Sequence, residues 1–572
     1  MLSRDAILDD LRAGPGPGHP APQPPAPEVL IIGAGINGVG VFRDLALQGV
    51  PGLLVDRGDI CSATSAASSR LIHGGLRYLE IGEFSLVRES VEERNRLLLD
   101  APHLVRPLRV RVPIADRFSG ALTSLGRFLG WVRTPGPKGA LVVALGLRAY
   151  DLFNRRDQTM PNHRMVPARE FRAQMPALAS STRYVAEFHD ARLTAPERLG
   201  LELVAQAEQM CPEARAATYL AVTGREGGRI LLADVLTGER FAVAPKLVVN
   251  CAGARVDEVD GRFGINQRLI GGTKGSHLVV RNRALVESLA DTMLYFETPD
   301  HRICLAYPLD ELHALVGTTD LRTDDPDDTI CSDAEIDYLF EVMAMAMPAI
   351  ALSRDEIVHT YAGIRPLPAS EGVAGAISRD HSIRAFEPQG DRPFPVLSLV
   401  GGKWTTFRAC AEEIADDILA RTGRARRRST AGIAIGGGAG WPVDPAPYVA
   451  ELARRFGLSL ERARVLFDRY GTAAASRLEG FAPQREVPLT TLPDYSYQEI
   501  VAIAREERVA RLEDIVLRRT HIALLGQATS EALAELGTVV GEALGWPPER
   551  IAHEIAAAAQ VIGTRHLVPG RT

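Results

Sequence analysis

A glycine-rich turn between two short apolar runs constrains this chain more than any other feature. Residues 28–32 have the composition of a buried parallel strand, and residues 36–48 have the pattern of a helix that Gly49 ends. A second strand candidate follows at 52–55, and Asp56 comes directly after it. The order strand, turn, helix, strand and acid predicts a dinucleotide-binding βαβ unit.

The residue types of this turn suit a bound pyrophosphate. Gly33 permits the tight turn, Gly35 lets the backbone approach the ligand, and Gly38 lets the helix pack closely against the strand. The start of the helix, which includes Asn37, offers unpaired N–H groups and a partial positive charge. Asp56 has the spacing of a ribose-binding carboxylate, roughly 20 residues after the first glycine. No Walker-type lysine follows, so a nucleoside triphosphate site is not indicated, and the dinucleotide itself stays open.

Length and composition bound the class of protein. The 572 residues exceed the size of one core and predict about two to four domains. The net charge of −6 gives no reason to expect nucleic acid as a partner. The six cysteines form no CxxC pair, which argues against a zinc site or a disulfide framework and suits the cytoplasm. No apolar run is long enough for a membrane-spanning helix.

The two ends of the chain differ in pattern. Residues 1–27 have helical potential at 3–11 and continue as a proline- and glycine-rich tract, so we expect a flexible leader. Residues 440–572 have helical spacing throughout, with Thr529 or Ser530 placed to cap one helix. We therefore expect a helical C-terminal domain.

A hydroxyl-rich loop follows Asp56 and Arg57 and ends in a double glycine. Such residues are poor core material, but their hydroxyl and backbone N–H groups suit a bound phosphate or ring. His73, Arg77 and Tyr78 place polar side chains beside the loop. The small residues that we single out are Thr64, Ser65, Ser68, Ser69, Gly74 and Gly75.

The segment 117–150 combines basic residues with aromatic and aliphatic ones and contains no acidic residue. That composition suits a segment that lies in a membrane surface. A buried helical hairpin broken at Pro135 is the alternative, and the sequence leaves both open.

Three further places bring small residues to the ends of strands. A strand ending at Asn250 runs into Gly253, which could let a second strand end approach the cofactor. Residues 269–320 hold short strands that suggest a separate antiparallel sheet. Gly401 and Gly402 open a helix after an apolar strand and offer backbone N–H groups to an anion or a ring carbonyl.

Cations lie close to these turns in the sequence. Arg365, Arg379 and Lys403 stand at expected loop ends rather than on a helix face. Singly, each suits an ordinary salt bridge. Together with Arg77 they could surround a phosphate, for which guanidinium groups are well shaped.

These motifs resemble the FAD-dependent glycerol-3-phosphate dehydrogenases, and the resemblance runs from about Val29 to the helical end. The most family-specific stretch is 62–80. The other matches follow in the order of the family: Lys274-Gly-Ser-His277, Gly317-Thr-Thr-Asp320, Gly363-Ile-Arg365-Pro, Ser378-Arg379-Asp380 and Gly401-Gly-Lys403 with Thr405-Thr406. The hydroxyl-rich loop and the turn at Gly401 favour FAD over a nicotinamide cofactor.

The resemblance implies an α/β fold with an FAD-binding Rossmann-like domain of the glutathione-reductase or amino-acid-oxidase type. An antiparallel substrate domain and a helical C-terminal domain complete it. We expect the FAD-binding domain at 28–115, 180–270 and 360–428, and the substrate domain at 116–179 and 271–359. The family also implies a cytoplasmic homodimer, peripherally bound to the inner face of the cell membrane, that passes electrons to a quinone.

The implied reaction is the oxidation of sn-glycerol 3-phosphate to dihydroxyacetone phosphate, in which a hydride leaves for the flavin and a base takes the hydroxyl proton. His73 is the favoured base because of its titration range. Arg365 stabilising an alkoxide, with Lys403 beside it, is the alternative, and His73 as a hydrogen-bond partner of the flavin is nearly as well supported.

The resemblance and the motifs together give the expected contacts. Substrate contacts are expected from Arg77, Tyr78, Lys274, Arg365, Arg379 and Lys403. FAD contacts are expected from Gly33, Gly35, Asn37, Gly38, Asp56, Arg57, Thr64, Ser65, Ser68, Ser69, His73, Gly74, Gly75, Gly253, Gly401, Gly402, Thr405 and Thr406.

Three alternatives stay open. The same scaffold could use oxygen as the electron acceptor, or it could oxidise a longer polyol phosphate such as erythritol phosphate. A non-catalytic flavin-binding protein is the alternative from a different class.

Overall fold

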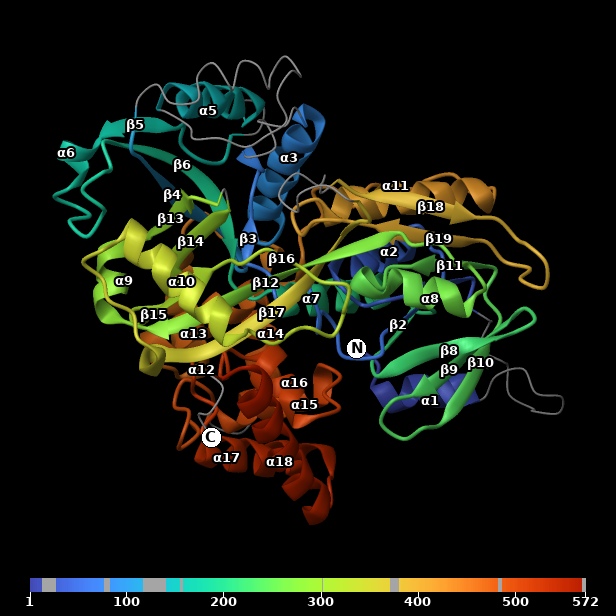
Figure 1. The fold of residues 1–572 in the computed structure, drawn as a ribbon. Coiled ribbons are helices and arrows are strands. Elements are labelled where there is room, and N and C mark those ends of the chain that lie inside the picture. The colour runs from blue at the N-terminus through green and yellow to red at the C-terminus, as the bar shows by residue number, and fades with distance from the viewer. Residues whose placement is uncertain are drawn as a thin grey trace.

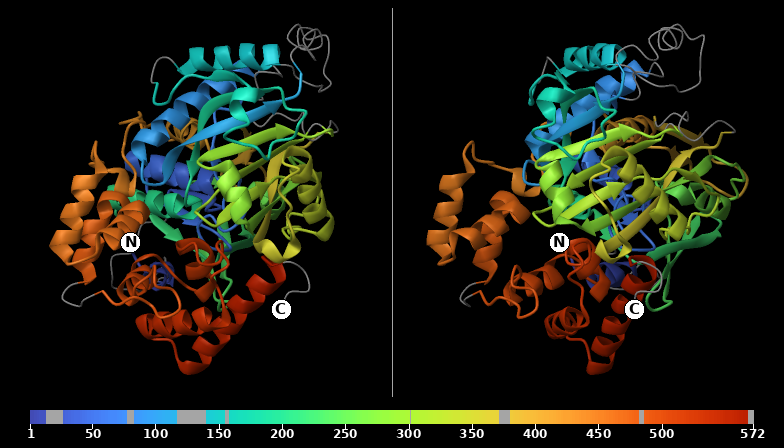
Figure 2. Two further views of the ribbon diagram at one scale, coloured as in Figure 1. Left: turned by 90° about the vertical axis from the view of Figure 1, so that its left-hand side faces the viewer. Right: turned by 60° about the vertical axis from the view of Figure 1, so that its left-hand side comes forward.

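Two large sheets and a C-terminal helical region organise the molecule, and the red helices nearest the chain end lie below the sheets (Figures 1 and 2). The computed structural model describes residues 1–12, 27–76, 83–116, 140–154, 158–300, 302–370, 380–481 and 486–567.

The six-stranded sheet is the nucleotide-binding one, and its strands lie in the order β18-β19-β11-β1-β2-β7. Five strands are parallel: β1 (Val29–Ile32), β2 (Gly52–Val55), β7 (Arg215–Ala217), β11 (Leu247–Asn250) and β19 (Val396–Val400). β18 (Ser382–Phe386) runs antiparallel at one edge. Side chains of β1 alternate between two apolar clusters, which explains its continuous apolar run.

Helices and a small sheet cover the two faces of this sheet. One face packs against α2 (Ile36–Leu47), α7 (Pro196–Met210) and α11 (Phe407–Arg421). The other face packs against α8 (Val256–Arg262) and the three-stranded sheet β8 (Leu220–Glu226), β9 (Arg229–Asp234) and β10 (Arg240–Val243).

The second sheet has ten strands and is largely antiparallel. Its main path is β16 (Leu321–Arg322), β12 (Ile270–Arg281), β15 (His313–Gly317), β14 (Ile303–Pro308), β13 (Thr292–Glu297), β4 (Val105–Ile114), β6 (Tyr184–Leu193) and β3 (Leu71–Ile72). Off this path, β17 (Ile357–Pro368) pairs with β12, and β5 (Arg164–Pro167) pairs with β6. One face carries α9 (Arg283–Leu289) and α10 (Asp333–Ala346), and the other carries α3 (Phe84–Asp100) and α5 (Ala140–Asn154). The single turn α6 (Ala168–Phe171) follows β5.

Four strands of the ten-stranded sheet lie in residue ranges that the sequence analysis gave to the FAD-binding domain: β3, β4, β6 and most of β17. β3 and β4 both pair with β6, and β17 pairs with β12. The expected FAD-binding ranges therefore contain strands of both large sheets, and the division of the chain into domains stays a prediction.

The first residues form an ordered helix, in contrast to the flexible leader expected for 1–27. α1 (Arg4–Arg12) buries Ile7 and Leu8 in the apolar cluster of the small sheet. Arg4 donates to the backbone carbonyl of Thr218 at 3.0 Å and pairs with Asp234. Residues 13–26 of the expected leader lie outside the described residues.

The C-terminal region is helical, as the sequence predicts. It comprises α12 (Pro445–Phe456), α13 (Leu460–Tyr470), α14 (Ala474–Phe481), α15 (Tyr497–Glu506), α16 (Leu512–Asp514), α17 (Ser530–Leu544) and α18 (Pro548–Arg565). The Thr529 hydroxyl accepts from the backbone N–H of Ala532 and caps α17. Among the described residues, no helix has the length and apolarity needed to cross a membrane.

Candidate active site

The glycine turn brings the ends of β1 and β11 into direct contact. Gly33 has φ +103°, and a Cβ added there would lie 2.4 Å from the carbonyl oxygen of Cys251. A Cβ on Gly38 would lie 1.9 Å from the Gly33 oxygen, and one on Gly35 would lie 3.2 Å from Ser65 Oγ. Close packing of backbone therefore requires glycine at 33 and 38, whereas at 35 an added Cβ would crowd the Ser65 hydroxyl.

Asp56 holds the turn from the end of β2. Its carboxylate accepts from the backbone N–H of Ala34 at 2.6 Å and of Gly58 at 2.8 Å. Burial raises the pKa of this carboxyl, although the two backbone donors oppose the shift. Arg57, by contrast, is exposed and lies 3.6 Å from Asp327.

The hydroxyl-rich loop spans the distance between the two sheets. At one end, Ser65 Oγ accepts from the first backbone N–H of α2, that of Ile36, at 3.0 Å. At the other, Thr64 Oγ1 donates to the carbonyl of Ile364 at 2.7 Å, and Ser69 Oγ lies 2.7 Å from His277 Nε2. Tyr361 OH on β17 donates to the backbone oxygen of Ser68 at 3.0 Å. These bonds fix the loop against both sheets.

The turn after β19 packs against this loop. Gly401 and Gly402 have φ of +82° and +100°. Trp404 Nε1 donates to the backbone oxygen of Ser65 at 2.9 Å, and Thr405 Oγ1 lies 3.2 Å from both the nitrogen and the oxygen of His73. Thr406 is buried at the start of α11.

The residues at the centre of these turns fit a dinucleotide. Asn37 Oδ1 is buried and has no hydrogen-bond partner among the described residues. A Cβ on Gly402 would lie 2.6 Å from Asn37 Nδ2, whereas one on Gly253, with φ +60°, would meet nothing within 4 Å. Glycine-lined turns at the N-terminus of α2 suit the pyrophosphate of FAD, and the buried Asn37 oxygen suits an N–H or hydroxyl donor of the same cofactor. We call this group of turns, residues 33–38, 56–75, 253 and 401–406, the cradle.

The double glycine that ends the loop packs against the α3–α5 side of the ten-stranded sheet. Gly74 N–H donates to Asp190 Oδ1 at 3.0 Å, and a Cβ on Gly74 would lie 2.1 Å from Tyr150 OH. Gly75 has φ +73°. Tyr150 in turn donates to the same carboxylate at 2.6 Å, so α5 is joined to the cradle.

Arg365 lies within strand β17, not at a loop end as expected. Its guanidinium donates to Asp320 Oδ1 at 3.0 Å and to Thr318 Oγ1 at 3.1 Å, and its side chain keeps 20% of its surface exposed. A Cβ on Gly275 would lie 2.1 Å from Arg365 Nη2, so this glycine provides the space that the guanidinium occupies. The alternation of β12 and β17 places Arg365 on the same face as His277 and the contacts to the loop.

Lys403 is the second cation beside the cradle. It follows the glycines of the closing turn, is 9% exposed, and donates from Nζ to Ser90 Oγ on α3 at 2.9 Å. A buried ammonium group at this place suits an anionic ligand.

Lys274 lies on the opposite face of β12 from Arg365, and its expected role as a substrate contact stays a prediction. It lies one position from the Gly275 that faces Arg365, so strand alternation turns its side chain to the opposite face, toward α10. There Nζ lies 2.7 Å from Asp328 and 3.0 Å from Glu335. Three further expected contacts, Arg77, Tyr78 and Arg379, lie outside the described residues.

His277 is a site residue that the sequence analysis quoted but did not select. Its ring stacks on Tyr361 at 4.9 Å between centroids, and Nε2 binds Ser69 of the loop. Burial, followed by the charges of Arg365 and Arg70, lowers the pKa of His277 to about 3. The available signal was its place in the Lys274-Gly-Ser-His277 motif.

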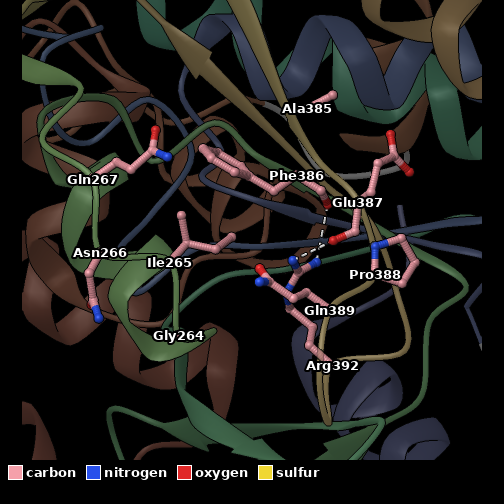
Figure 3. Close-up of a pocket in the computed structure, with 10 residues that line it drawn as sticks. All are labelled: Gly264, Ile265, Asn266, Gln267, Ala385, Phe386, Glu387, Pro388, Gln389 and Arg392. Carbon is pink, nitrogen blue, oxygen red and sulfur yellow. Dashed lines mark hydrogen bonds between the residues drawn. The ribbon is translucent and has the colours of Figure 1, made fainter.

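A separate pocket of about 440 Å³ lies between the end of α8 and the β18–β19 hairpin (Figure 3). Arg392 donates there to the backbone oxygens of Phe386, Glu387 and Phe394 and so closes the hairpin. None of the residues that line this pocket belongs to the cradle.

Comparison with known proteins agrees with this geometry. The profile of the family described as FAD dependent oxidoreductase matches residues 28–417, and that of the C-terminal domain of alpha-glycerophosphate oxidase matches 428–551. A glycerol-3-phosphate dehydrogenase of Synechocystis is 36% identical over 94% of this chain and 96% of its own length. A D-erythritol 1-phosphate dehydrogenase of Brucella abortus is 32% identical over 68% of this chain and 73% of its own.

A solved structure extends the agreement to the fold. The glycerol-3-phosphate dehydrogenase of Bacillus halodurans, complexed with FAD, superposes with a TM-score of 0.74 at 21% identity, covering 100% of both chains. The expected fold class and the expected cofactor, FAD, are therefore confirmed. The chain belongs to the family of FAD-dependent glycerol-3-phosphate dehydrogenases.

Proposed function

We propose that this protein oxidises sn-glycerol 3-phosphate to dihydroxyacetone phosphate and passes the electrons to a quinone. The observation that carries the proposal is that two cations flank the cradle, Arg365 on β17 and Lys403 after the closing turn. An uncharged alcohol would not require them, whereas a phosphate monoester would. The names of the relatives, which span almost the whole chain, support the same substrate.

Arg365 is suited to hold charge on the substrate without moving. Asp320 and Thr318 fix its guanidinium, and the backbone oxygen of Thr319 accepts from it at 3.3 Å. A fixed guanidinium stabilises a phosphate in the bound substrate or a developing alkoxide, and it costs no reorganisation during the reaction.

The remaining roles follow from position. FAD, when bound, supplies the acceptor for the hydride. Lys403 adds a second positive charge at the closing turn, and His73, whose backbone is tied to Thr405, stays the proposed base. Arg77, Tyr78 and Arg379 stay proposed substrate contacts on the strength of the family resemblance.

A longer polyol phosphate is a second candidate substrate, because the relative from Brucella abortus is named for D-erythritol 1-phosphate. An anaerobic titration of the purified yellow protein with each phosphate separates the two. We expect sn-glycerol 3-phosphate to bleach the flavin at lower concentration. Bleaching by the four-carbon phosphate alone would assign the other substrate, and bleaching by neither would indicate a non-catalytic flavoprotein.

The membrane surface is the proposed site of electron transfer. Three leucines of α5, Leu141, Leu145 and Leu152, are 48%, 57% and 59% exposed, and the exposed Arg148 lies among them. Apolar side chains with a basic neighbour suit an anionic lipid surface. The rest of the predicted segment, 117–139, lies outside the described residues.

Co-sedimentation with anionic vesicles tests this surface. We expect Leu145→Gln combined with Leu152→Gln to weaken binding about tenfold, since two exposed apolar side chains that would enter the lipid surface are lost. Unchanged binding would contradict the role of α5.

Assay of the purified enzyme with a soluble quinone and with oxygen distinguishes the proposed acceptor from the oxidase alternative. The homodimer stays a prediction, which sedimentation velocity tests.

A further inference from the structure

Two neighbouring arginines of the C-terminal region bind the loop behind the cradle. Arg518 and Arg519 end the π-helix η8 (Ile515–Arg519). The Arg519 guanidinium donates to both oxygens of Asp59, at 2.5 and 2.9 Å, and Arg518 Nε donates to Oδ2 at 2.8 Å. Asp59 is fully buried, so this carboxylate is balanced by charges from a distant part of the chain.

Asp59 lies in the middle of a loop that holds the glycine turn from both sides. Before it, the Asp56 carboxylate accepts from Ala34 N–H at 2.6 Å. After it, Cys61 N–H donates to the Ala34 carbonyl at 2.9 Å, and Cys61 has φ +54°. A non-glycine residue keeps that conformation only where its surroundings hold it. The position of Asp59 therefore affects both contacts to the turn.

The arginines are themselves held rigidly. Arg519 donates from Nε and Nη2 to the backbone oxygen of Glu507 at 3.1 and 2.9 Å. Arg518 Nη2 donates to Asp514 Oδ1 at 2.5 Å. Tyr219 OH donates to the same Asp514 oxygen at 2.6 Å, while its backbone N–H binds the carbonyl of Gly58 at 2.8 Å. Tyr219 therefore gives the C-terminal region a second connection to the loop, through Gly58.

Because the charges in this network are buried, removal of one of them is expected to destabilise the others. Burial alone would raise the pKa of Asp59, but the guanidinium groups of Arg519 and Arg518 outweigh it and lower that pKa. Removal of one partner from a buried ion pair leaves an uncompensated charge, which the surrounding structure relieves by moving or by admitting water. Because Asp59 belongs to the loop 56–61, we expect that loop to shift when one of the arginines is removed.

We propose that Arg518 and Arg519 are positioning residues for FAD. They hold Asp59, and through it the loop 56–61, in the shape in which the turn at Ala34 receives the ribose and pyrophosphate. The C-terminal region then contributes to cofactor affinity through the back of the cradle. The inference concerns the cofactor alone and is independent of the substrate proposed above.

The test heats the holoenzyme and follows FAD fluorescence and far-ultraviolet circular dichroism together. We expect FAD release to precede unfolding by several degrees in Arg519→Gln and to coincide with it in the unmodified protein. The FAD dissociation rate of the folded variant should rise at least tenfold. A matched control is Arg508→Gln, which removes another buried arginine of the same region, one that pairs with Glu208 on α7 and donates to the Leu2 carbonyl at 3.1 Å. That control should lose FAD only as it unfolds.

The inference would be overturned if Arg519→Gln released FAD only as it unfolded. It would also be overturned if Arg508→Gln released FAD before unfolding by as many degrees as Arg519→Gln. If Arg519→Gln yields no folded holoenzyme, Arg519→Lys keeps the charge but not the two-bond contact, and the same separation is expected.

Hydrogen exchange provides a test that requires no variant. Because coupling between two sites is reciprocal, removal of FAD from the unmodified protein should speed amide exchange at 515–519. Exchange in α13 should stay unchanged and serves as the control. Unchanged exchange at 515–519 would count against the proposal. A protein that never retained FAD would instead contradict the cofactor assignment.

Discussion

Lys274 and Arg365 lie on hydrogen-bonded neighbouring strands, yet the structure gives them opposite surroundings. Arg365 pairs across β17 and β12 with Thr273, and Lys274 pairs with Ile364, so the two side chains point to different faces. On the Arg365 face are His277, Tyr361 and the cradle. On the Lys274 face are α10 and the apolar side chains of Leu278 and Val280.

The two cations consequently do different work. Lys274 neutralises Glu335, which also accepts from Ser276 and Thr319 hydroxyls at 2.6 and 2.8 Å, and it stabilises the packing of α10 on the sheet. Arg365 pairs with a partly buried acid, Asp320, and its side chain retains 20% of its surface exposed. The strand register, not the residue type, decides which of the two cations lies on the face of the cradle, and we propose that this cation contacts the substrate.

The largest expected effect is that of Arg365→Ala on catalysis. Loss of a fixed guanidinium should lower kcat/KM for sn-glycerol 3-phosphate by roughly 10²–10³-fold, because it removes charge stabilisation at the reacting end of the cradle. Steady-state kinetics measures this, and the flavin content of the variant controls for folding. A loss smaller than fivefold would place the substrate elsewhere.

A smaller effect, and of a different kind, is expected for Lys274→Met. This variant leaves the buried Glu335 without its counter-charge and should lower the free energy of unfolding by about 3 kcal/mol. The holoenzyme that remains folded should keep its kcat/KM within a few-fold. Urea unfolding provides the measurement, and Arg283→Met, at the exposed pair with Glu287, serves as the control that leaves the midpoint unchanged. A strong loss of kcat/KM with unchanged stability would reverse the assignment of the two faces.

The smallest expected effect is the pH dependence contributed by His277. Its pKa is about 3 in the folded protein, against an ordinary value of 6.5, so the unfolded chain binds more protons below that value. Stability should therefore fall as the pH falls, by about 1.5 kcal/mol between pH 6.5 and 5 for this one group. His277→Asn should show a correspondingly weaker decline in urea unfolding, whereas His553→Asn, on the exposed side of α18, should follow the unmodified protein. An identical decline in all three would contradict a neutral, buried His277.

Local motifs made the cradle predictable from sequence. The turn at Gly33 needs a left-handed conformation and close backbone contact, and few sequences other than glycines with this spacing provide both. The closing turn at Gly401 was recognisable for the same reason.

Features that depend on register or on distant contacts were not predictable in this way. The choice between Lys274 and Arg365 requires the positions of two strands relative to each other, and the sequence shows neither. Likewise, nothing local connects Arg519 with Asp59, because their contact joins parts of the chain more than 400 residues apart. The helix α1 is stabilised by burial of Ile7 and Leu8 against the small sheet, whose strands come much later in the sequence.

The most direct test is a rapid-mixing anaerobic experiment on three proteins: the unmodified enzyme, Arg365→Ala and Lys274→Met. Each is mixed with sn-glycerol 3-phosphate, and the rate of flavin bleaching is recorded. We predict fast bleaching in the unmodified enzyme and in Lys274→Met, and bleaching at least a hundredfold slower in Arg365→Ala. Equal rates in the unmodified enzyme and Arg365→Ala, or slow bleaching in Lys274→Met alone, would contradict the account.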